Sequence, residues 1–362
     1  MRGGSILNLW RLGLFSLVLT LGLAPTSHSA VPAAHSPDAL PSSVLDFARP
    51  GQLVPVGAGR LLNLRCIGSG SPTVILDAGG GQFSIAWRKV QAEVATFARV
   101  CSYDRAGYGF SDPNDRPSTA TNIVDDLRQA LARAGVEGPL LLVGHSAGGL
   151  YVTLYADLHP TEVVGLVLVD PAFASQNHDN ALAVWSAYPE ILAEQRRQQV
   201  AGWKLKQDCA DLARAGQLKA EALRACPCIT APKDQPELAS YVVSYCSGAK
   251  QYEAMLAEEA ALTGTVGDSS SVSTAQEAAA AQSFGTTPLI VLTSASGWRY
   301  AGREEPNALL TMVWRAGHVG LAARSSRGKV VVVPNSGHLI QSNKPHAVVD
   351  AIREVIDAAR RG

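Results

Sequence analysis

The sequence of 362 residues is poor in charge: charged side chains make up 17%, and the formal net charge is zero. It lacks a basic stretch of the kind that binds nucleic acid, and it lacks an acidic tail. No internal repeat is evident. Hydrophobic residues make up 47%, which is typical of an ordered globular protein. A chain of this length can bury a large core in one or two domains, and no nucleic-acid partner is expected.

The first thirty residues differ in character from the rest. Arg2 and Arg11 stand before a compact apolar run over 12–24, and Pro25 and small polar residues follow it. This pattern predicts a secretory signal peptide over residues 1–30. The run is short for a membrane span and no strong basic block follows it. We therefore expect the segment to be removed, leaving no stable membrane span. The cleavage site stays open.

Residues 31–50 are rich in Pro, Ala and Ser and are expected to form a flexible lead-in. All six cysteines lie after this segment, and an even number of cysteines in an exported chain suggests disulfide bonds. The protein is therefore expected to be secreted or periplasmic, and the sequence does not distinguish the two.

Four of the cysteines gather in one region, which includes the sequence C-P-C at 226–228. These four could instead bind zinc, but their spacing is not a standard ligand pattern and no histidine lies close by, which favours bridges. The proline between Cys226 and Cys228 disfavours a bond between those two. Pairing each of them with Cys209 or Cys246 leaves two connectivities open.

A series of β-like runs predicts a sheet in the first half of the chain. The runs at 139–144 and 163–170 are continuously apolar, as expected of parallel strands that are covered on both faces. Before them, Ile123, Leu127 and Leu131 recur at helical spacing. Alternating strands and helices predict an α/β sheet with crossover helices. The other expected strands are 60–68, 72–79 and 98–105.

This alternation stops after Pro171. The chain from there to about residue 285 is helical in pattern, polar and alanine-rich. Strand-like runs return at 287–294 and 328–335, and a final helix has its apolar residues on one face. We therefore predict an α/β core interrupted by a helical insertion, with the core at 51–170 and 286–362 and the insertion at 171–285.

The sequence Gly144-His145-Ser146-Ala147-Gly148 is a G-x-S-x-G pattern that stands after an apolar strand and before a helix-like stretch. This context is typical of a nucleophile elbow, and an ordinary tight turn is the alternative. Small residues are needed because the turn is strained and backbone segments pack closely around it. We predict that Ser146 is a nucleophile. The helix that starts near Ala147 would direct its N–H groups at the same place, which favours an oxyanion.

The chain here resembles the α/β-hydrolase superfamily over roughly residues 52–360. The resemblance implies a mostly parallel central sheet with helices on both faces and a helical cap insertion. Within the superfamily, the chain is similar to secreted or periplasmic serine hydrolases. The segments that carry the resemblance occur in the family's order: VILDAGGGQFSIAW, VCSYDRAGYGFSD, LLLVGHSAGGL, GLVLVDPA and VPNSGHLIQSNKP.

A serine hydroxyl needs a base to take its proton. The family order of serine, acid and histidine implies that the base lies near the C-terminus. His338 fits, because it follows the strand-like KVVVVP in the sequence NSGHLI. The other histidines are expected in other roles: His145 as support for the elbow, His318 within a helix, and His346 at the surface or a helix start.

The position of the catalytic acid in the sequence departs from the commonest family pattern. In many relatives it follows the strand that PLIVLTS matches, but the first carboxylates after this run are Glu304 and Glu305. The superfamily's other position follows the preceding strand. Asp170 in LVLVDPA occupies it and resembles the acid of pancreatic-type lipases; a purely structural Asp is the alternative. We predict Asp170, with Glu304 or Glu305 as rivals, because a rigid strand end is the better mount for a group that holds an imidazole.

The resemblance also implies a second oxyanion donor in the loop after TVILDAG. The sequence Ala-Gly-Gly-Gly at 78–81 takes the place of the commoner His-Gly pair. Matching the glycines assigns the donor to the Gly80 N–H, paired with the Ala147 N–H, and a merely flexible loop is the alternative. Asp104 and Arg105, in YDRAGYGFSD, are expected to tie loops together under the site.

Two further expectations come from the resemblance. The usual strand order implies that Cys66 and Cys101 lie on neighbouring strands and form a disulfide. The cap is where the superfamily forms a substrate pocket. Trp185, Tyr188 and Trp203 could line that pocket or form the cap's own core.

These features predict a serine hydrolase that cleaves a carboxylic ester through an acyl-enzyme and requires no metal or organic cofactor. The expected partner is a small-molecule ester or acyl substrate; its identity and the oligomeric state stay open. Peptidase and lactonase activities are alternatives. Epoxide hydrolase and dehalogenase are disfavoured, because those relatives place Asp where Ser146 stands. A hydrolase-like binding protein without catalysis is the rival from another class.

Overall fold

The computed structural model describes residues 47–361, apart from 220–221, 227, 230–237, 265–270, 298–299 and 301. These residues belong to one unit that spans 39–362, and the other unit spans 1–38. The predicted signal peptide and residues 31–46 of the lead-in lie outside the described residues. None of the helices within the described part is long and apolar enough to cross a membrane.

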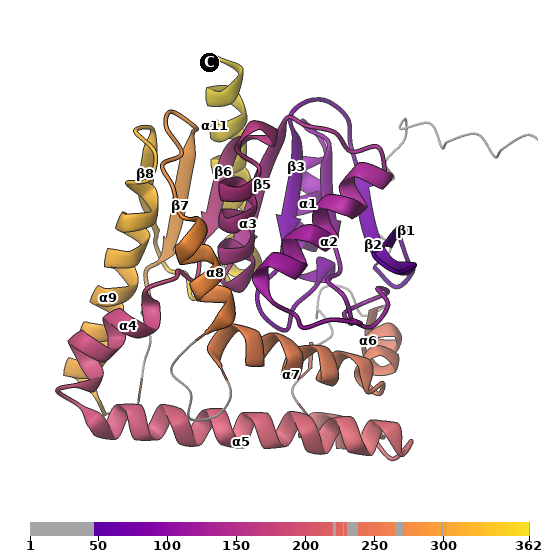
Figure 1. The fold of residues 1–362 in the computed structure, drawn as a ribbon, viewed down its shortest axis with the longest axis vertical. Coiled ribbons are helices and arrows are strands. Elements are labelled where there is room, and N and C mark those ends of the chain that lie inside the picture. Colours follow the sequence, from indigo (N-terminus) through magenta and orange to yellow (C-terminus); the bar gives the residue numbers. More distant parts are fainter. Residues whose placement is uncertain are drawn as a thin grey trace, which may run out of the picture. The chain divides into compact units, whose positions relative to one another are not determined.

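The described residues form an eight-stranded sheet in the order β1-β2-β4-β3-β5-β6-β7-β8 (Figure 1). The pairs β1–β2 and β2–β4 are antiparallel, and the remaining pairs are parallel. The predicted α/β-hydrolase fold is therefore confirmed. The strands are β1 (Gln52–Val56), β2 (Arg60–Ile67), β3 (Thr73–Asp77), β4 (Val100–Tyr103), β5 (Leu140–His145), β6 (Val163–Val169), β7 (Leu289–Ser294) and β8 (Gly328–Val333).

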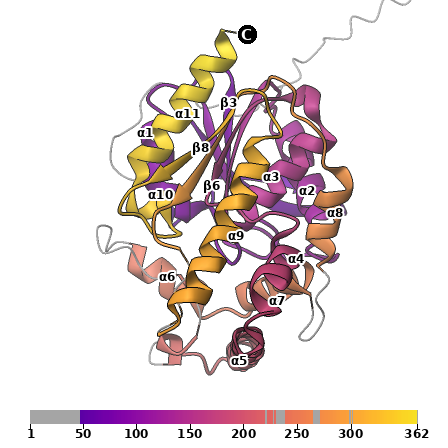
Figure 2. The same cartoon turned by 90° about the vertical axis from the view of Figure 1, so that its left-hand side faces the viewer.

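Helices cover both faces of this sheet (Figure 2). Alternate strand residues point to opposite sides, so that Val74 packs with α1 and α11 while Ile75 packs with α2 and α3. Every residue of β5 is buried, which explains its continuous apolar run. The helices outside the β6–β7 connection are α1 (Arg88–Val94), α2 (Ala120–Arg133), α3 (Ala147–Leu158), α9 (Glu304–Ala322), α10 (Ile340–Asn343) and α11 (Pro345–Arg360), with the short turns η1 (Ser84–Trp87) and η2 (Pro160–Glu162).

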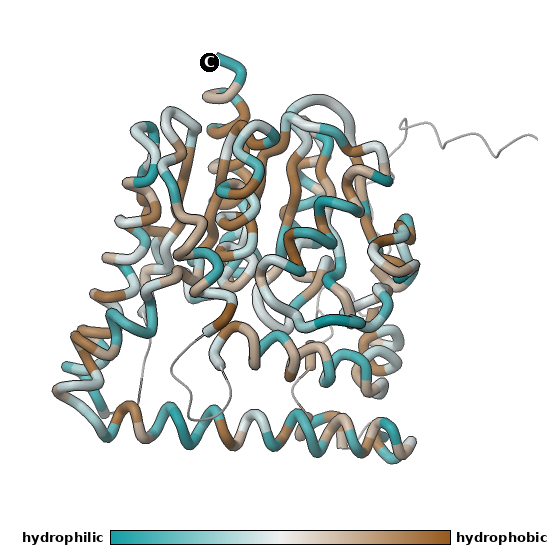
Figure 3. Tube along the Cα trace, viewed as in Figure 1, coloured by the Kyte–Doolittle hydropathy of each residue, from teal (hydrophilic) through white to brown (hydrophobic). Residues whose placement is uncertain are grey.

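The connection between β6 and β7 is helical in its described part. Its long helix α5 buries only three of its 26 residues, and hydrophilic stretches run along it (Figure 3). Helix α8 instead packs against α2 and α3, beside the sheet. The division into core and insertion at 171 and 285 stays a prediction. The elements are α4 (Gln176–Asn180), η3 (Ala181–Trp185), α5 (Pro189–Arg214), η4 (Ala222–Arg224), α6 (Ala239–Cys246), α7 (Lys250–Thr263) and α8 (Val272–Ala280).

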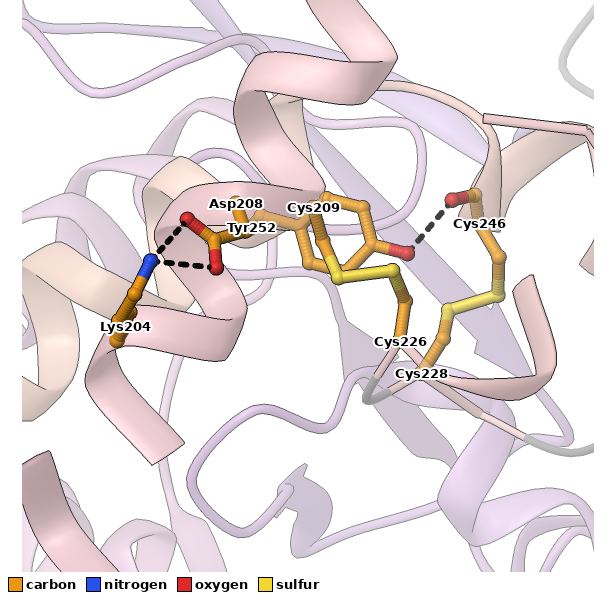
Figure 4. The surroundings of a disulfide bond; sticks show 7 residues. All are labelled: Lys204, Asp208, Cys209, Cys226, Cys228, Cys246 and Tyr252. Atoms are coloured by element: carbon orange, nitrogen blue, oxygen red, sulfur yellow. Dashed lines mark hydrogen bonds and ion pairs between the residues drawn. A yellow bond between two sulfur atoms is a disulfide. The ribbon is translucent and has the colours of Figure 1, made fainter. Parts of the chain in front are cut away.

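The six cysteines form three disulfides. Cys66 and Cys101 are direct partners in the β2–β4 ladder and are bonded, as predicted. The connection between β6 and β7 has the bonds Cys209–Cys226 and Cys228–Cys246 (Figure 4). The zinc alternative is excluded for these four residues, because their sulfurs are bonded in pairs.

Candidate active site

Ser146 stands at the sharp corner between β5 and α3. Its backbone has φ 50° and ψ −119°, a conformation that costs a non-glycine residue about 1–3 kcal/mol. Three backbone hydrogen bonds hold the corner. The Ser146 N–H donates to the Val169 oxygen at 3.1 Å, and the Ser146 oxygen accepts from the N–H groups of Gly149 and Ala172, each at 2.9 Å. The strain is therefore maintained by surrounding structure, as expected of a functional position.

The glycines of the motif are required by close approach. A Cβ on Gly144 would collide with the carbonyl oxygen of Gly148, and a Cβ on Gly148 would lie 2.5 Å from the carbonyl oxygens of Asp77 and Ala78. Larger side chains would push the turn away from β3. The two glycines of G-x-S-x-G are thus required because any larger side chain at either position would not fit at this corner.

The structure brings His338 and Asp170 together. Asp170 follows β6, His338 lies in the loop after β8, and the imidazole Nδ1 is 2.7 Å from Asp170 Oδ2. Asp170 is buried and has φ 44°, so it too stands at a tight corner. Glu304 and Glu305, the rival acids, are exposed in the first turn of α9. Of the three carboxylates proposed from the sequence, Asp170 is the one bonded to His338.

Four further donors surround the Asp170 carboxylate, the longest being the Thr293 hydroxyl to Oδ1 at 3.5 Å. The Ser294 N–H and the Trp314 Nε1–H donate to Oδ1 at 2.9 and 3.0 Å, and the Ser294 hydroxyl donates to Oδ2 at 3.1 Å. Burial raises the pKa of Asp170, but the hydrogen bonds from His338, Ser294 and Trp314 outweigh burial and leave the pKa below its ordinary value. Asp170 is therefore ionised at neutral pH and can stabilise an imidazolium.

Ser294 and Trp314 were missed by the sequence reasoning. Ser294 ends β7, next to the commoner family position of the acid. The lack of a carboxylate after this strand was the one feature of the sequence that marked the place. Trp314 lies within α9 and belongs to no motif.

The other histidines have different surroundings. His145 is buried, and its Nε2 lies 3.0 Å from the carbonyl oxygen of His338, so it braces the His338 loop. Burial, with a smaller effect of His338, lowers the pKa of His145 to about 3, and the neutral ring donates this bond. His318 is buried in α9, with Nε2 3.0 Å from the Pro171 oxygen. His346 is exposed at the start of α11.

The loop after β3 makes a β-turn over Gly79–Gln82, closed by the Gln82 N–H donating to the Gly79 oxygen at 3.0 Å. Gly81 has φ 71°, as the third residue of a type II turn requires. A Cβ on Gly80 would lie 3.7 Å from the Ala147 Cβ, so the two predicted oxyanion donors are neighbours.

Arg105 binds two carbonyl oxygens at the start of this turn. Its Nη1 donates to the Ala78 oxygen and its Nη2 to the Gly79 oxygen, each at 2.7 Å. A trans peptide points its C=O and N–H in opposite directions. The bond to the Gly79 oxygen therefore turns the Gly80 N–H away from Arg105. The expected tie between loops is present.

A buried charge cluster continues from Arg105. Its guanidinium lies 2.7 Å from Asp77, whose other oxygen accepts from the Tyr103 hydroxyl at 2.8 Å. Burial raises the pKa of Asp77 to about 6 against the opposing effect of Arg105. Asp104 also ties loops: it accepts from the N–H groups of Ser84 and Phe110 at 3.1 and 3.0 Å.

A family model described as the alpha/beta hydrolase family matches residues 74–351, which is well over half of the chain. The chain belongs to this family. The match includes the Ser146 corner, Asp170 and His338.

Individual curated relatives resemble only parts of this chain. An uncharacterised protein of Bacillus subtilis, YqjL, is 35% identical over 105 residues, covering 29% of this chain and 42% of that protein. A 2-hydroxymuconate semialdehyde hydrolase of Pseudomonas is 35% identical over 146 residues, covering 39% and 51%. The chain spans less than half the length of the first curated relatives that it matches.

Among solved structures, a thermophilic esterase from Thermogutta terrifontis aligns with a TM-score of 0.50 and 18% identity. The alignment covers 86% of this chain and 99% of the esterase. At this identity the likeness is one of fold.

Two cavities lie beside the helical connection between β6 and β7. One of about 700 Å³ is lined by Gly80, Gly81 and Leu339, and on the α7 side by Met255 and Leu262. Another of about 810 Å³ is lined by Trp185 and Trp314 together with amide side chains such as Asn180 and Gln199. Both share Glu259 and Thr263 at the end of α7. Of the predicted pocket aromatics, Trp185 lines a cavity; Tyr188 and Trp203 line neither.

Proposed function

We propose that this hydrolase cleaves a carboxylic ester, with Ser146, His338 and Asp170 as its catalytic triad. The observation that carries the proposal is the 2.7 Å bond between His338 Nδ1 and Asp170 Oδ2. The two residues follow β8 and β6, so they lie at the same edge of the sheet as Ser146, which follows β5. Holding Nδ1 in this way fixes the tautomer whose Nε2 can accept a proton.

The reaction follows from these roles. Ser146 Oγ attacks the ester carbonyl carbon while His338 Nε2 takes the hydroxyl proton. The oxyanion accepts hydrogen bonds from the Gly80 and Ala147 N–H groups. His338 then gives its proton to the departing alkoxide, which leaves as the alcohol. Water attacks the acyl-enzyme and loses a proton to His338, and collapse then releases the acid as His338 returns that proton to Ser146 Oγ.

Two features argue for catalysis over a binding role. The missing acid after β7 was the only support for a non-catalytic protein, and Asp170 supplies a carboxylate to the imidazole from β6 instead. Ser146 also keeps a strained backbone that binding alone does not require. Peptidase or lactonase chemistry would use the same groups and is the alternative to ester cleavage.

The location that we propose is secreted or periplasmic. Three disulfides support an oxidising compartment, since such bonds are rare in proteins that remain in a reducing cytosol. The charged and apolar pattern of residues 1–30 is the sequence basis of the same proposal.

The test is hydrolysis of p-nitrophenyl esters from acetate to decanoate by the mature protein. We expect turnover that depends on chain length and is lost in Ser146→Ala and His338→Ala. Thermal unfolding of each variant checks that it is folded. No turnover of any ester by a folded wild type would contradict the ester assignment, and turnover retained in Ser146→Ala would contradict the nucleophile.

A further inference from the structure

Glu258 is a buried carboxylate that the proposed reaction does not use. It belongs to α7, in the helical connection between β6 and β7, and is only 3% exposed. Its Oε2 accepts from the Gly81 N–H at 2.9 Å and from the Tyr108 hydroxyl at 2.7 Å. A residue of the insertion thus binds the backbone of the turn that contains the predicted oxyanion donor.

The other oxygen of Glu258 joins the same turn through Arg105. Oε1 lies 3.0 Å from the Arg105 guanidinium and accepts from the Tyr151 hydroxyl at 3.1 Å. Burial, and next the negative charge of Glu258, raise the pKa of Tyr108 and of Tyr151. Both hydroxyls therefore keep their protons and act as donors, so the contacts of this carboxylate with the Gly81 N–H, Arg105, Tyr108 and Tyr151 are all with donors.

Gly80 lies between two peptide groups that are each held from outside. The peptide before it is fixed by the bond from Arg105 to the Gly79 oxygen. The peptide after it is fixed by the bond from the Gly81 N–H to Glu258. A glycine has no Cβ to restrict its backbone, so the direction of the Gly80 N–H depends on these two anchors together with the turn's own bond from the Gln82 N–H to the Gly79 oxygen.

We propose that Glu258 is a positioning residue: its carboxylate holds the Gly79–Gln82 turn so that the Gly80 N–H faces the oxyanion. The inference rests on the proposed function. If Glu258 has this role, the oxyanion site is complete only when α7 is packed against the core. The helical connection between β6 and β7 then contributes to catalysis as well as lining the cavities.

The experiment measures kcat and KM for p-nitrophenyl butyrate in wild type, Glu258→Gln and Glu258→Asp. Glutamine keeps the shape but has one acceptor, so either the Gly81 N–H or Arg105 must face an NH₂ group. Aspartate keeps the charge for Arg105 but is one methylene too short to reach Gly81. The matched control is Glu253→Gln, since Glu253 is exposed on the same helix and pairs with Arg214.

Loss of an oxyanion donor lowers kcat by about 10²–10³-fold, and kcat should fall less when the donor is present but misdirected. We therefore expect kcat to fall by roughly 10- to 100-fold in both Glu258 variants with KM within about twofold, because the interaction strengthens in the transition state. Each kcat is divided by the fraction of Ser146 that a fluorophosphonate titrates to completion, so that inactive protein does not count. Glu253→Gln should match wild type.

An unchanged kcat per titrated serine in either folded Glu258 variant would overturn the inference while leaving the proposed function intact. A rise in KM alone would also overturn it, since that would place Glu258 in ground-state binding. If neither variant folds, Glu258 is a requirement of the fold and the inference fails. A wild type that neither hydrolyses the ester nor is titrated would remove the proposed function first, and the inference with it.

Discussion

Asp170 and His338 are 168 residues apart in the chain, and their side chains are joined by a 2.7 Å bond between Oδ2 and Nδ1. Each lies in a loop that follows a parallel strand, β6 or β8, so the sheet sets their separation. The same carboxylate is held by Ser294 and Trp314, which leaves it little freedom to rotate away from the imidazole.

The acid role predicts a large effect of Asp170→Asn. The amide would favour the wrong imidazole tautomer and could not stabilise its cation, so kcat for p-nitrophenyl butyrate should fall by about 10⁴-fold. The control is the double change Glu304→Gln and Glu305→Gln, which alters exposed carboxylates and should leave kcat near wild type. A large loss in the double variant with little loss in Asp170→Asn would reverse the assignment.

The indole of Trp314 should contribute to stability through Asp170. Trp314→Phe removes one donor to a buried carboxylate, and hydrogen bonds to charged groups are worth about 1.5–3 kcal/mol. Denaturant titration should show a loss of this size. Trp185→Phe is the control, because it makes the same chemical change at a half-buried tryptophan whose Nε1 has no bonding partner among the residues that the structure describes. Equal losses in the two variants would argue against the hydrogen bond.

His145 should make stability depend on pH below neutrality. Its folded pKa of about 3 results mainly from burial, whereas an unfolded histidine has a pKa of about 6.5. Between these values the unfolded chain binds more protons, so stability falls as pH falls. From pH 6.5 to 5 the loss from this residue is about 2 kcal/mol.

Denaturant titrations across that range should therefore give a shallower pH profile for His145→Gln than for wild type. His346→Gln, which alters an exposed ring, should follow the wild-type profile. If the His145→Gln and wild-type profiles run parallel, the buried histidine titrates normally and this reasoning is wrong.

The insertion disulfides should be identifiable in non-reduced peptide maps as Cys209–Cys226 and Cys228–Cys246. Each bond closes a loop of similar, short length, so removing one pair by Cys→Ser changes should cost about 3 kcal/mol in the chain-entropy account. Fragments joined as Cys209–Cys228 and Cys226–Cys246 would contradict the pairing.

Local patterns predicted the features whose cause is local. The corner at Ser146 needs Gly144 and Gly148 for packing, so the presence of these glycines in the motif was enough to predict the tight corner. The apolar run of β5 has the same simple cause, burial on both faces. The Cys66–Cys101 bond followed from strand order, which the resemblance supplied.

Contacts through space were not predictable in this way. Glu258 stands in an alanine-rich helix with two other glutamates nearby, and nothing local marks it as the one that reaches Gly81, 177 positions earlier. The choice between the two pairings with Cys209 and Cys246 was equally open, because the proline between Cys226 and Cys228 argues only against a bond between those two. His145 was expected to support the elbow, and that stays a prediction; its ring bonds the His338 backbone, a contact that sequence spacing does not show.

The central claim is that Ser146 is a nucleophile activated by His338. The most direct measurement is the rate of fluorophosphonate labelling of the mature protein, with the modified peptide mapped by mass spectrometry. The account predicts one label per chain, on Ser146, and a rate that collapses in His338→Ala while the protein stays folded. A folded wild type that remains unlabelled, or a label on another residue, would contradict it.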